Sequence, residues 1–185
     1  MRFFKRNEKG FTLVELLVAI PIIGLLGLAM GAVLMQLLRS DNISERMLAV
    51  RQVQVAGDKV SQDAVQAQTV TFRTMTDSAG FLNLYWTGQW EDDAGAFVSR
   101  TVNVTYTLVP AKGKYELQRH EVSQETVGAT TQNRDFTTTV GEYLDASQMS
   151  CQWASSDNTS FALKVVAVVG TKVEDRTYTI SPRSF

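Results

Sequence analysis

One carboxylate stands alone inside a long apolar stretch of the sequence. Residues 11–38 contain a single charged side chain, Glu15, and four basic residues precede the stretch: Arg2, Lys5, Arg6 and Lys9. A carboxylate in apolar surroundings is costly unless a cation accompanies it. The chemistry that Glu15 favours is therefore the binding of a cationic group.

The other reactive residue types are few and scattered. His120 is the only histidine and lies among charged residues, so we expect it at the surface, with neither a catalytic nor a zinc-binding role. Cys151 is the only cysteine; we interpret it as a buried strand residue, and an intermolecular disulfide is the alternative. The sequence predicts no enzyme activity, no metal and no cofactor.

Two local clusters have both a binding and a structural interpretation. The acidic residues Glu91–Asp93 offer oxygen ligands of the kind that calcium prefers, although a solvated loop is the commoner meaning of such a run. Tyr85, Trp86 and Trp90 could form a surface patch, and we expect them in the core instead. Neither cluster predicts a function by itself.

The charge balance argues against a nucleic-acid-binding surface. The whole chain has 18 basic and 19 acidic residues, a net charge of −1. Removing residues 1–10 takes away four basic residues and one acidic residue, which leaves 14 and 18 and a net charge of −4. A protein that binds a phosphate backbone should be basic.

The apolar stretch is long enough to cross a membrane. Its 28 residues would form a helix of about 42 Å, against a hydrocarbon core of about 30 Å. The preceding basic residues predict a cytoplasmic N-terminus and an exported C-terminal part. A cleaved secretory signal should be about half as long. A plain anchor does not account for Glu15, and the length disfavours a buried core helix.

The remainder predicts an α+β domain. Apolar residues at three- and four-residue spacing predict that a helix continues over residues 39–68, with one stripe against a sheet: Ile43, Met47, Val50, Val53, Ala56, Val60 and Ala64. Alternating patterns from about Thr69 predict antiparallel hairpins over residues 69–185. We expect residues 123–139, rich in Ser, Thr, Gln and Asn, to form a long loop.

The junction Lys9-Gly-Phe-Thr-Leu-Val-Glu15, followed by the apolar stretch, resembles the N-terminus of type IV prepilins and of the pseudopilins of type II secretion. The resemblance implies that a prepilin peptidase cuts between Gly10 and Phe11 and methylates the new amino group of Phe11. It also implies that Glu15 aids assembly, by pairing with the cationic amine of a neighbouring subunit. A pilin-like fold would place the C-terminal half of a long helix on an antiparallel sheet.

The helix departs from the usual family pattern at Pro21. A proline inside a helix removes one hydrogen bond and clashes with the carbonyl four residues earlier, so we expect a kink near Leu17–Pro21. Gly27 and Gly31 form a small-xxx-small pair that allows another helix to approach closely in lipid.

These expectations combine into one functional hypothesis and one alternative. The chain would be a minor pilin or pseudopilin with a cytoplasmic leader (residues 1–10), a transmembrane and assembly helix (11–38), an amphipathic continuation (39–68) and a β-rich domain (69–185). Its implied partners are the peptidase, other subunits, an inner-membrane assembly platform and membrane lipid, and its implied location is the cytoplasmic membrane and then a filament. The alternative is a membrane-anchored exported domain that binds a ligand and does not polymerise.

Overall fold

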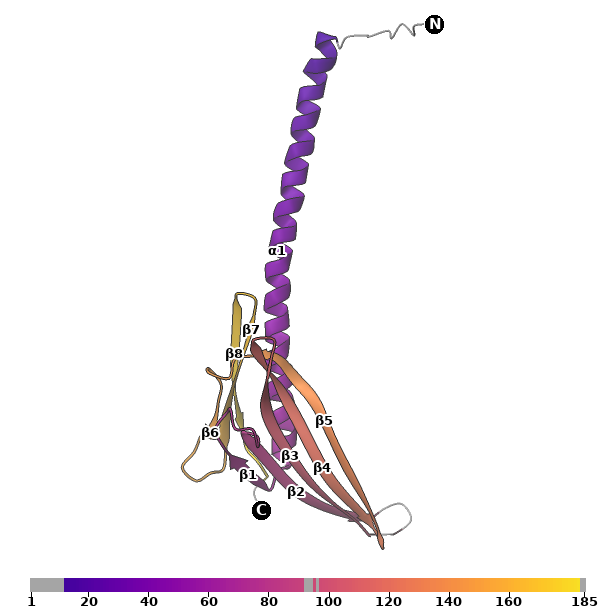
Figure 1. Cartoon of the computed structure of the whole chain (residues 1–185), viewed down its shortest axis with the longest axis vertical. Helices are drawn as coiled ribbons and strands as arrows, with labels where there is room; N and C mark the ends of the chain where they lie inside the picture. Colours follow the sequence, from indigo (N-terminus) through magenta and orange to yellow (C-terminus); the bar gives the residue numbers. More distant parts are fainter. Residues whose placement is uncertain (1–11, 92–94, 96, 184–185) are drawn as a thin grey trace, which may run out of the picture. The chain divides into compact units, whose positions relative to one another are not determined.

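The computed structural model describes residues 12–91, 95 and 97–183; for residues 37–42 it describes the backbone only. The chain divides into two units, residues 1–43 and 44–185. One helix, α1 (Leu13–Gln66), contributes to both units (Figure 1). The strands that follow are β1 (Thr69–Phe72), β2 (Leu82–Glu91), β3 (Phe97–Ala111), β4 (Lys114–Val127), β5 (Thr130–Leu144), β6 (Ser150–Trp153), β7 (Phe161–Val169) and β8 (Lys172–Ile180). The predicted α+β class is confirmed.

The strands of the second unit form one antiparallel sheet of eight strands. From β1 to β5 each strand pairs with the next one along the chain, and Figure 1 shows β2 to β5 lying side by side. One edge of β7 pairs with β8, while β6 and the end of β5 pair with its other edge. The single Leu144–Ala167 pair is the only ladder contact between β5 and β7 that the described residues provide.

Residues 123–139 are not the loop that their composition predicted. They belong to β4 and β5, which pair from Val127–Thr130 onward and leave only Gly128 and Ala129 in the turn. Gly128 adopts a positive φ of 58°, a conformation that glycine accepts without steric cost. Residues 130–139 of β5 are exposed throughout, so no apolar alternation marked this strand.

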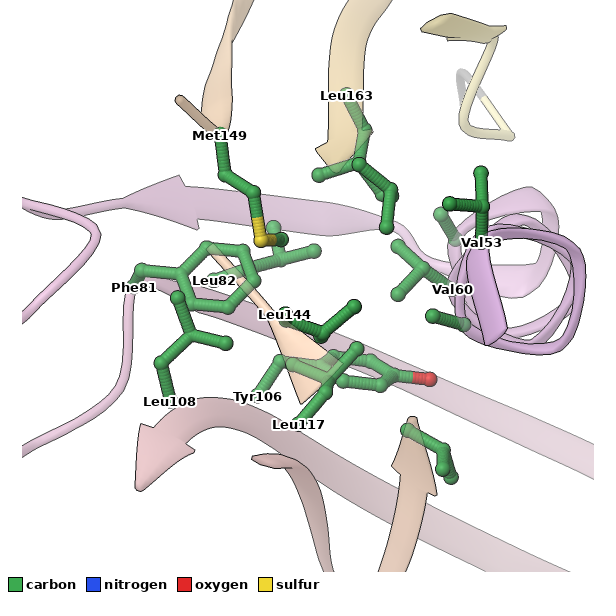
Figure 2. Packing of buried hydrophobic residues seen from close by; sticks show 14 of the residues in the cluster. Val53, Val60, Phe81, Leu82, Tyr106, Leu108, Leu117, Leu144, Met149 and Leu163 are labelled. Carbon is green, nitrogen blue, oxygen red and sulfur yellow. The ribbon is translucent and has the colours of Figure 1, made fainter. Parts of the chain in front are cut away.

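The core of the second unit lies between α1 and the sheet. The buried residues of the helix are Ala49, Val53, Ala56, Val60 and Ala64, spaced by three or four. Figure 2 shows Val53 and Val60 facing the cluster that contains Leu144 and Leu163. Four of the seven predicted stripe residues are therefore buried, whereas Ile43, Met47 and Val50 are exposed. Ala49, not Val50, faces the sheet, so the predicted stripe started on the wrong side of the helix.

Small residues let the helix approach the sheet closely. A Cβ atom added to Gly57 would overlap the aromatic ring of Tyr178 on β8. The Tyr178 hydroxyl donates a hydrogen bond to the Val53 carbonyl oxygen at 3.1 Å, which holds the ring against the helix. Close packing at this point therefore requires glycine.

A buried carboxylate also joins the helix to the sheet. Asp63 on α1 is 3% exposed. It accepts hydrogen bonds from the hydroxyl of Tyr106 on β3, at 2.7 Å, and from the guanidinium of Arg119 on β4. Lys59, one helical turn earlier, places its Nζ 3.4 Å from the other Asp63 oxygen. Burial and the adjacent Asp63 charge raise the pKa of Tyr106, so the hydroxyl stays a donor.

The ion network continues along the sheet. Arg119 also contacts Glu121 at 2.6 Å, and Glu121 in turn accepts from Arg100 on β3 at 3.1 Å. Burial disfavours the charge of Arg119, but its hydrogen bonds to Asp63 and Glu121 outweigh that cost and raise its pKa above the ordinary value. The network fixes how the helix lies on the sheet, because moving either element would leave buried charges unpaired.

Candidate functional site

The expected cleavage junction lies outside the described residues. Gly10 and Phe11 precede Thr12, where the description of the chain begins. Glu15 falls in the first turn of α1, which starts at Leu13. The structure therefore describes Glu15 and its surroundings. The assembly role of Glu15 and the cleavage and methylation positions stay predictions.

Thr12 and Glu15 cap the start of α1. The Glu15 carboxylate accepts hydrogen bonds from the backbone N–H and the hydroxyl of Thr12, both at 2.9 Å. In return the Thr12 hydroxyl accepts from the backbone N–H of Glu15 at 3.3 Å. This reciprocal pattern is a capping box. The sequence analysis missed Thr12, although Thr-x-x-Glu before an apolar run is a signature of this motif.

The capping box supplies hydrogen bonds to Glu15 but no opposite charge. Among the residues that the structure describes, no cation lies within ion-pair distance of its carboxylate. Glu15 lies on one side of α1 together with the apolar residues Val14, Val18, Ala19 and Ile22. A cationic group placed there would meet an oriented carboxylate at the edge of an apolar surface.

The helix that carries Glu15 presents an apolar surface. Residues Leu13–Gln36 are strongly apolar, and the most apolar part of this segment is not buried by the described residues. The exposed side chains include Leu13, Leu28 and Met30. A soluble protein rarely exposes so continuous an apolar surface, so lipid or another protein must cover it. The length and composition suffice for a single membrane span.

Pro21 does not end the helix. It lies inside α1, which continues for 45 residues beyond it, from Ile22 to Gln66. Apart from the neighbouring residues of α1 itself, a Cβ atom added to Gly27 or Gly31 would meet no described atom within 4 Å. These glycines are therefore free to contact another molecule. The kink at Pro21 and the packing roles of both glycines stay predictions.

The remaining candidates behave as structural residues. His120 lies at the surface as predicted, with its Nε2 atom 2.7 Å from a carboxylate oxygen of Asp135. Cys151 lies in β6 and packs half-buried against the core, and burial raises the pKa of its thiol to about 12. Of the acidic cluster, Asp92 and Asp93 lie outside the described residues. Within the described part of the chain, no three His, Cys, Asp or Glu side chains are grouped so that they could hold a metal ion.

The expectation of a core position was wrong for two of the three clustered aromatic residues. Tyr85 is 38% exposed and Trp90 is 44% exposed, while Trp86 is half-buried and packs against the core. Tyr85 and Trp86 are consecutive in β2, so they point to opposite faces of the sheet. Trp90 lines a pocket with Val65 and Gln66, the last residues of α1, where the core ends.

The comparisons with known proteins agree with the geometry of the N-terminal helix. Residues 5–31 match the family model described as the prokaryotic N-terminal methylation motif. No curated protein and no solved structure shows a significant match to the chain. Proteins with this motif have structural rather than catalytic roles. The chain therefore carries, at residues 5–31, the N-terminal signature of type IV prepilins and pseudopilins.

Proposed function

We propose that this chain is a minor pilin or pseudopilin, a structural subunit of a type IV pilus-like or type II secretion filament. The observation that carries the proposal is Glu15, an oriented carboxylate on an exposed apolar helix, with no cation near it among the described residues. The methylation motif over the same segment supports the same conclusion. The protein would act as a building block and not as an enzyme.

Maturation would create the missing cation. A prepilin peptidase would remove residues 1–10 on the cytoplasmic side of the membrane and methylate the amino group of Phe11. That amine of one subunit would pair with Glu15 of its neighbour, and the pair would set the axial position of each helix. Residues 11–38 would then form the assembly helix, residues 39–68 its amphipathic continuation and residues 69–185 the exported domain.

N-terminal sequencing and intact-mass measurement of membrane-extracted protein test the maturation step. We expect the chain to begin at methylated Phe11, because Gly10 allows an extended backbone to enter a protease cleft. Expression without the peptidase is the control and should leave residues 1–10 in place. A mature chain that begins near residue 30 would identify an ordinary secretory signal and refute the proposal.

Replacing Glu15 by Val tests assembly. Insertion of the helix should improve by about 2–3 kcal/mol, because the only charge of the apolar stretch is gone. Assembly should weaken by about 3–5 kcal/mol, because the amine of the neighbour loses its buried partner. Fractionation into membrane-bound protein and sheared filaments separates the two effects, which have opposite signs.

Two matched variants complete this experiment. Gln36→Val removes a polar, uncharged side chain from the far end of the apolar segment, and we expect normal filament incorporation. Glu15→Asp keeps the charge on a shorter side chain, and assembly should be partly retained. If Glu15→Val enters filaments as well as the native chain, Glu15 has no role in assembly. If the native chain itself enters no filament, the alternative leads: a membrane-anchored exported domain that does not polymerise.

A further inference from the structure

Strand β2 carries two tryptophans that flank a glycine. Trp86, Gly88 and Trp90 alternate along the strand and therefore share one face of the sheet. A pocket of about 460 Å³ opens beside them, and the end of α1 and Arg100 on β3 also line it. Trp90 is 44% exposed, which is unusual for so large an apolar side chain.

Gly88 leaves a gap beside the Trp90 ring. A Cβ atom added to Gly88 would meet only the edge of the Trp90 ring, at 3.9 Å. In the β2–β3 ladder Gly88 lies opposite Arg100, so the guanidinium-bearing side chain adjoins the gap. Arg100 is held by the hydrogen bond from its Nη2 atom to Glu121. The result is a slot whose lining includes both tryptophans, with a polar group at its border.

The wall of the slot is held in place by an amide side chain. Gln68 follows α1, and its side chain donates to the Thr87 carbonyl at 2.8 Å and accepts from the Thr87 N–H at 3.2 Å. Its backbone N–H donates to the Tyr85 carbonyl at 2.9 Å. These bonds fasten the chain after α1 to the two residues of β2 that flank Trp86. A site fixed in this way loses little entropy on binding.

We propose that this slot binds a pyranose unit of a β-linked glucose or N-acetylglucosamine polysaccharide. In such rings the bulky substituents are equatorial, so both faces present flat C–H surfaces that stack on indole rings. The ring hydroxyls lie at the edge, where guanidinium and amide groups form paired hydrogen bonds. Arg100, Gln66 and Gln68 supply such groups at the border of the pocket.

The charge around the slot favours a neutral ligand over a polyanion. Two arginines line the pocket, Arg100 and Arg183, and each interacts with another group of the chain. Arg100 is paired with Glu121, and Glu125 lies opposite Arg100 in the β3–β4 ladder. A nucleic acid needs a run of cations along its phosphates, and the chain as a whole has a net charge of −1. A purely apolar partner would leave the remaining donors and acceptors of Arg100, Gln66 and Gln68 buried without partners, which is costly. A sugar ring suits both parts of the pocket, because its C–H faces pack on the indole rings and its hydroxyls bind the polar side chains.

This site is independent of filament assembly. It lies on residues of the second unit, and a filament subunit or a membrane-anchored domain could equally present it. Loss of sugar binding would not weaken the assignment of Glu15, and loss of assembly would not remove the slot.

Calorimetric titration of the full chain tests the proposal. The protein is kept in micelles of a detergent without a sugar headgroup, and cellotetraose, chitotetraose and a single-stranded oligonucleotide are the probes. We expect one of the two tetrasaccharides to bind. Trp90→Ala removes one stacking face and should weaken binding by about tenfold or more. Gly88→Val fills the gap and should abolish binding. Valine is β-branched and is common in strands, so the variant should keep its fold.

Tyr85→Ala is the matched control, since Tyr85 is an exposed aromatic residue on the opposite face of the same strand. It should bind as the native chain does, and circular dichroism should show the same fold for all three variants. Three results would each overturn the proposal: neither tetrasaccharide binds, Gly88→Val binds as well as the native chain, or the oligonucleotide binds more tightly than the sugars.

Discussion

Two carboxylates on the same helix meet opposite surroundings. Asp63 is buried, and it finds Arg119, Lys59 and the Tyr106 hydroxyl within its own chain. Glu15 is exposed on an apolar segment, and Thr12 is its only hydrogen-bonding partner among the described residues. The first carboxylate is satisfied by folding. The second has hydrogen bonds but no counter-charge, so it is suited to a partner from another molecule.

The glycines of α1 repeat this contrast. Gly57 is closed off by the Tyr178 ring, whereas Gly27 and Gly31 face open space. Small residues in the C-terminal part of the helix therefore serve packing within the chain. Those in the N-terminal part are available to a neighbour. One helix thus contains a completed interface and an incomplete one.

The largest expected effect comes from Asp63. Replacing it by Ala leaves Arg119 and the Tyr106 hydroxyl buried without their acceptor, which should lower the free energy of unfolding by about 3–5 kcal/mol. Urea unfolding followed by circular dichroism measures the change in the second unit. Asp58→Ala, an exposed carboxylate on the same helix, should change it by less than about 0.5 kcal/mol. If Asp63→Ala and Asp58→Ala lower the free energy of unfolding equally, the buried pairing of Asp63 does not stabilise the second unit.

A smaller effect is expected from the glycines. Gly57→Ala forces the Tyr178 ring to move and should cost about 1–3 kcal/mol in the same assay. Gly27→Ala adds a methyl group in open space and should not destabilise the isolated chain. If Gly27→Ala instead reduces filament incorporation, the incomplete interface includes this glycine. A Gly57→Ala variant as stable as the native chain would show that the close approach is not required.

The smallest effect should come from Thr12. Thr12→Val removes the hydroxyl of the capping box and should weaken the first turn of α1 by about 1 kcal/mol. Amide hydrogen exchange of residues 13–16 in micelles measures this change, with Thr69→Val at the start of β1 as a control away from the helix. Unchanged exchange would mean that Glu15 does not depend on Thr12 for its orientation.

The sequence was sufficient where the signal is local. The apolar run around Glu15, the basic residues before it and the β alternation of Val102, Val104 and Tyr106 all predict structure within a few residues. Each of these features follows from side-chain periodicity or from the cost of burying charge. The α+β class could therefore be predicted without any knowledge of strand order.

The sequence was insufficient where burial depends on distant partners. Arg119 and Glu121 have the composition of a surface strand, and only their pairing with Asp63 and Arg100 makes them interior residues. The long β4–β5 hairpin was missed because one of its strands buries too few residues to show a pattern. Both faces of β5 near Thr130 meet solvent, so the polar composition carried no period. Trp90 was expected in the core because it is large and apolar. It is exposed because α1 ends beside it, and the sequence alone did not predict that position.

The strand order has a consequence for how the second unit folds. Each strand from β1 to β5 pairs with the next one along the chain, so these pairings close short loops and can form in order as the chain emerges. The β7–β8 hairpin can form in the same local way. Strands β1–β5 and the β7–β8 hairpin are joined by the Leu144–Ala167 pair and by the docking of α1. Helix α1 is synthesised first, but it can dock only after these strands have formed. We therefore expect two fast local steps and one slower closing step, in which Asp63 meets Arg119.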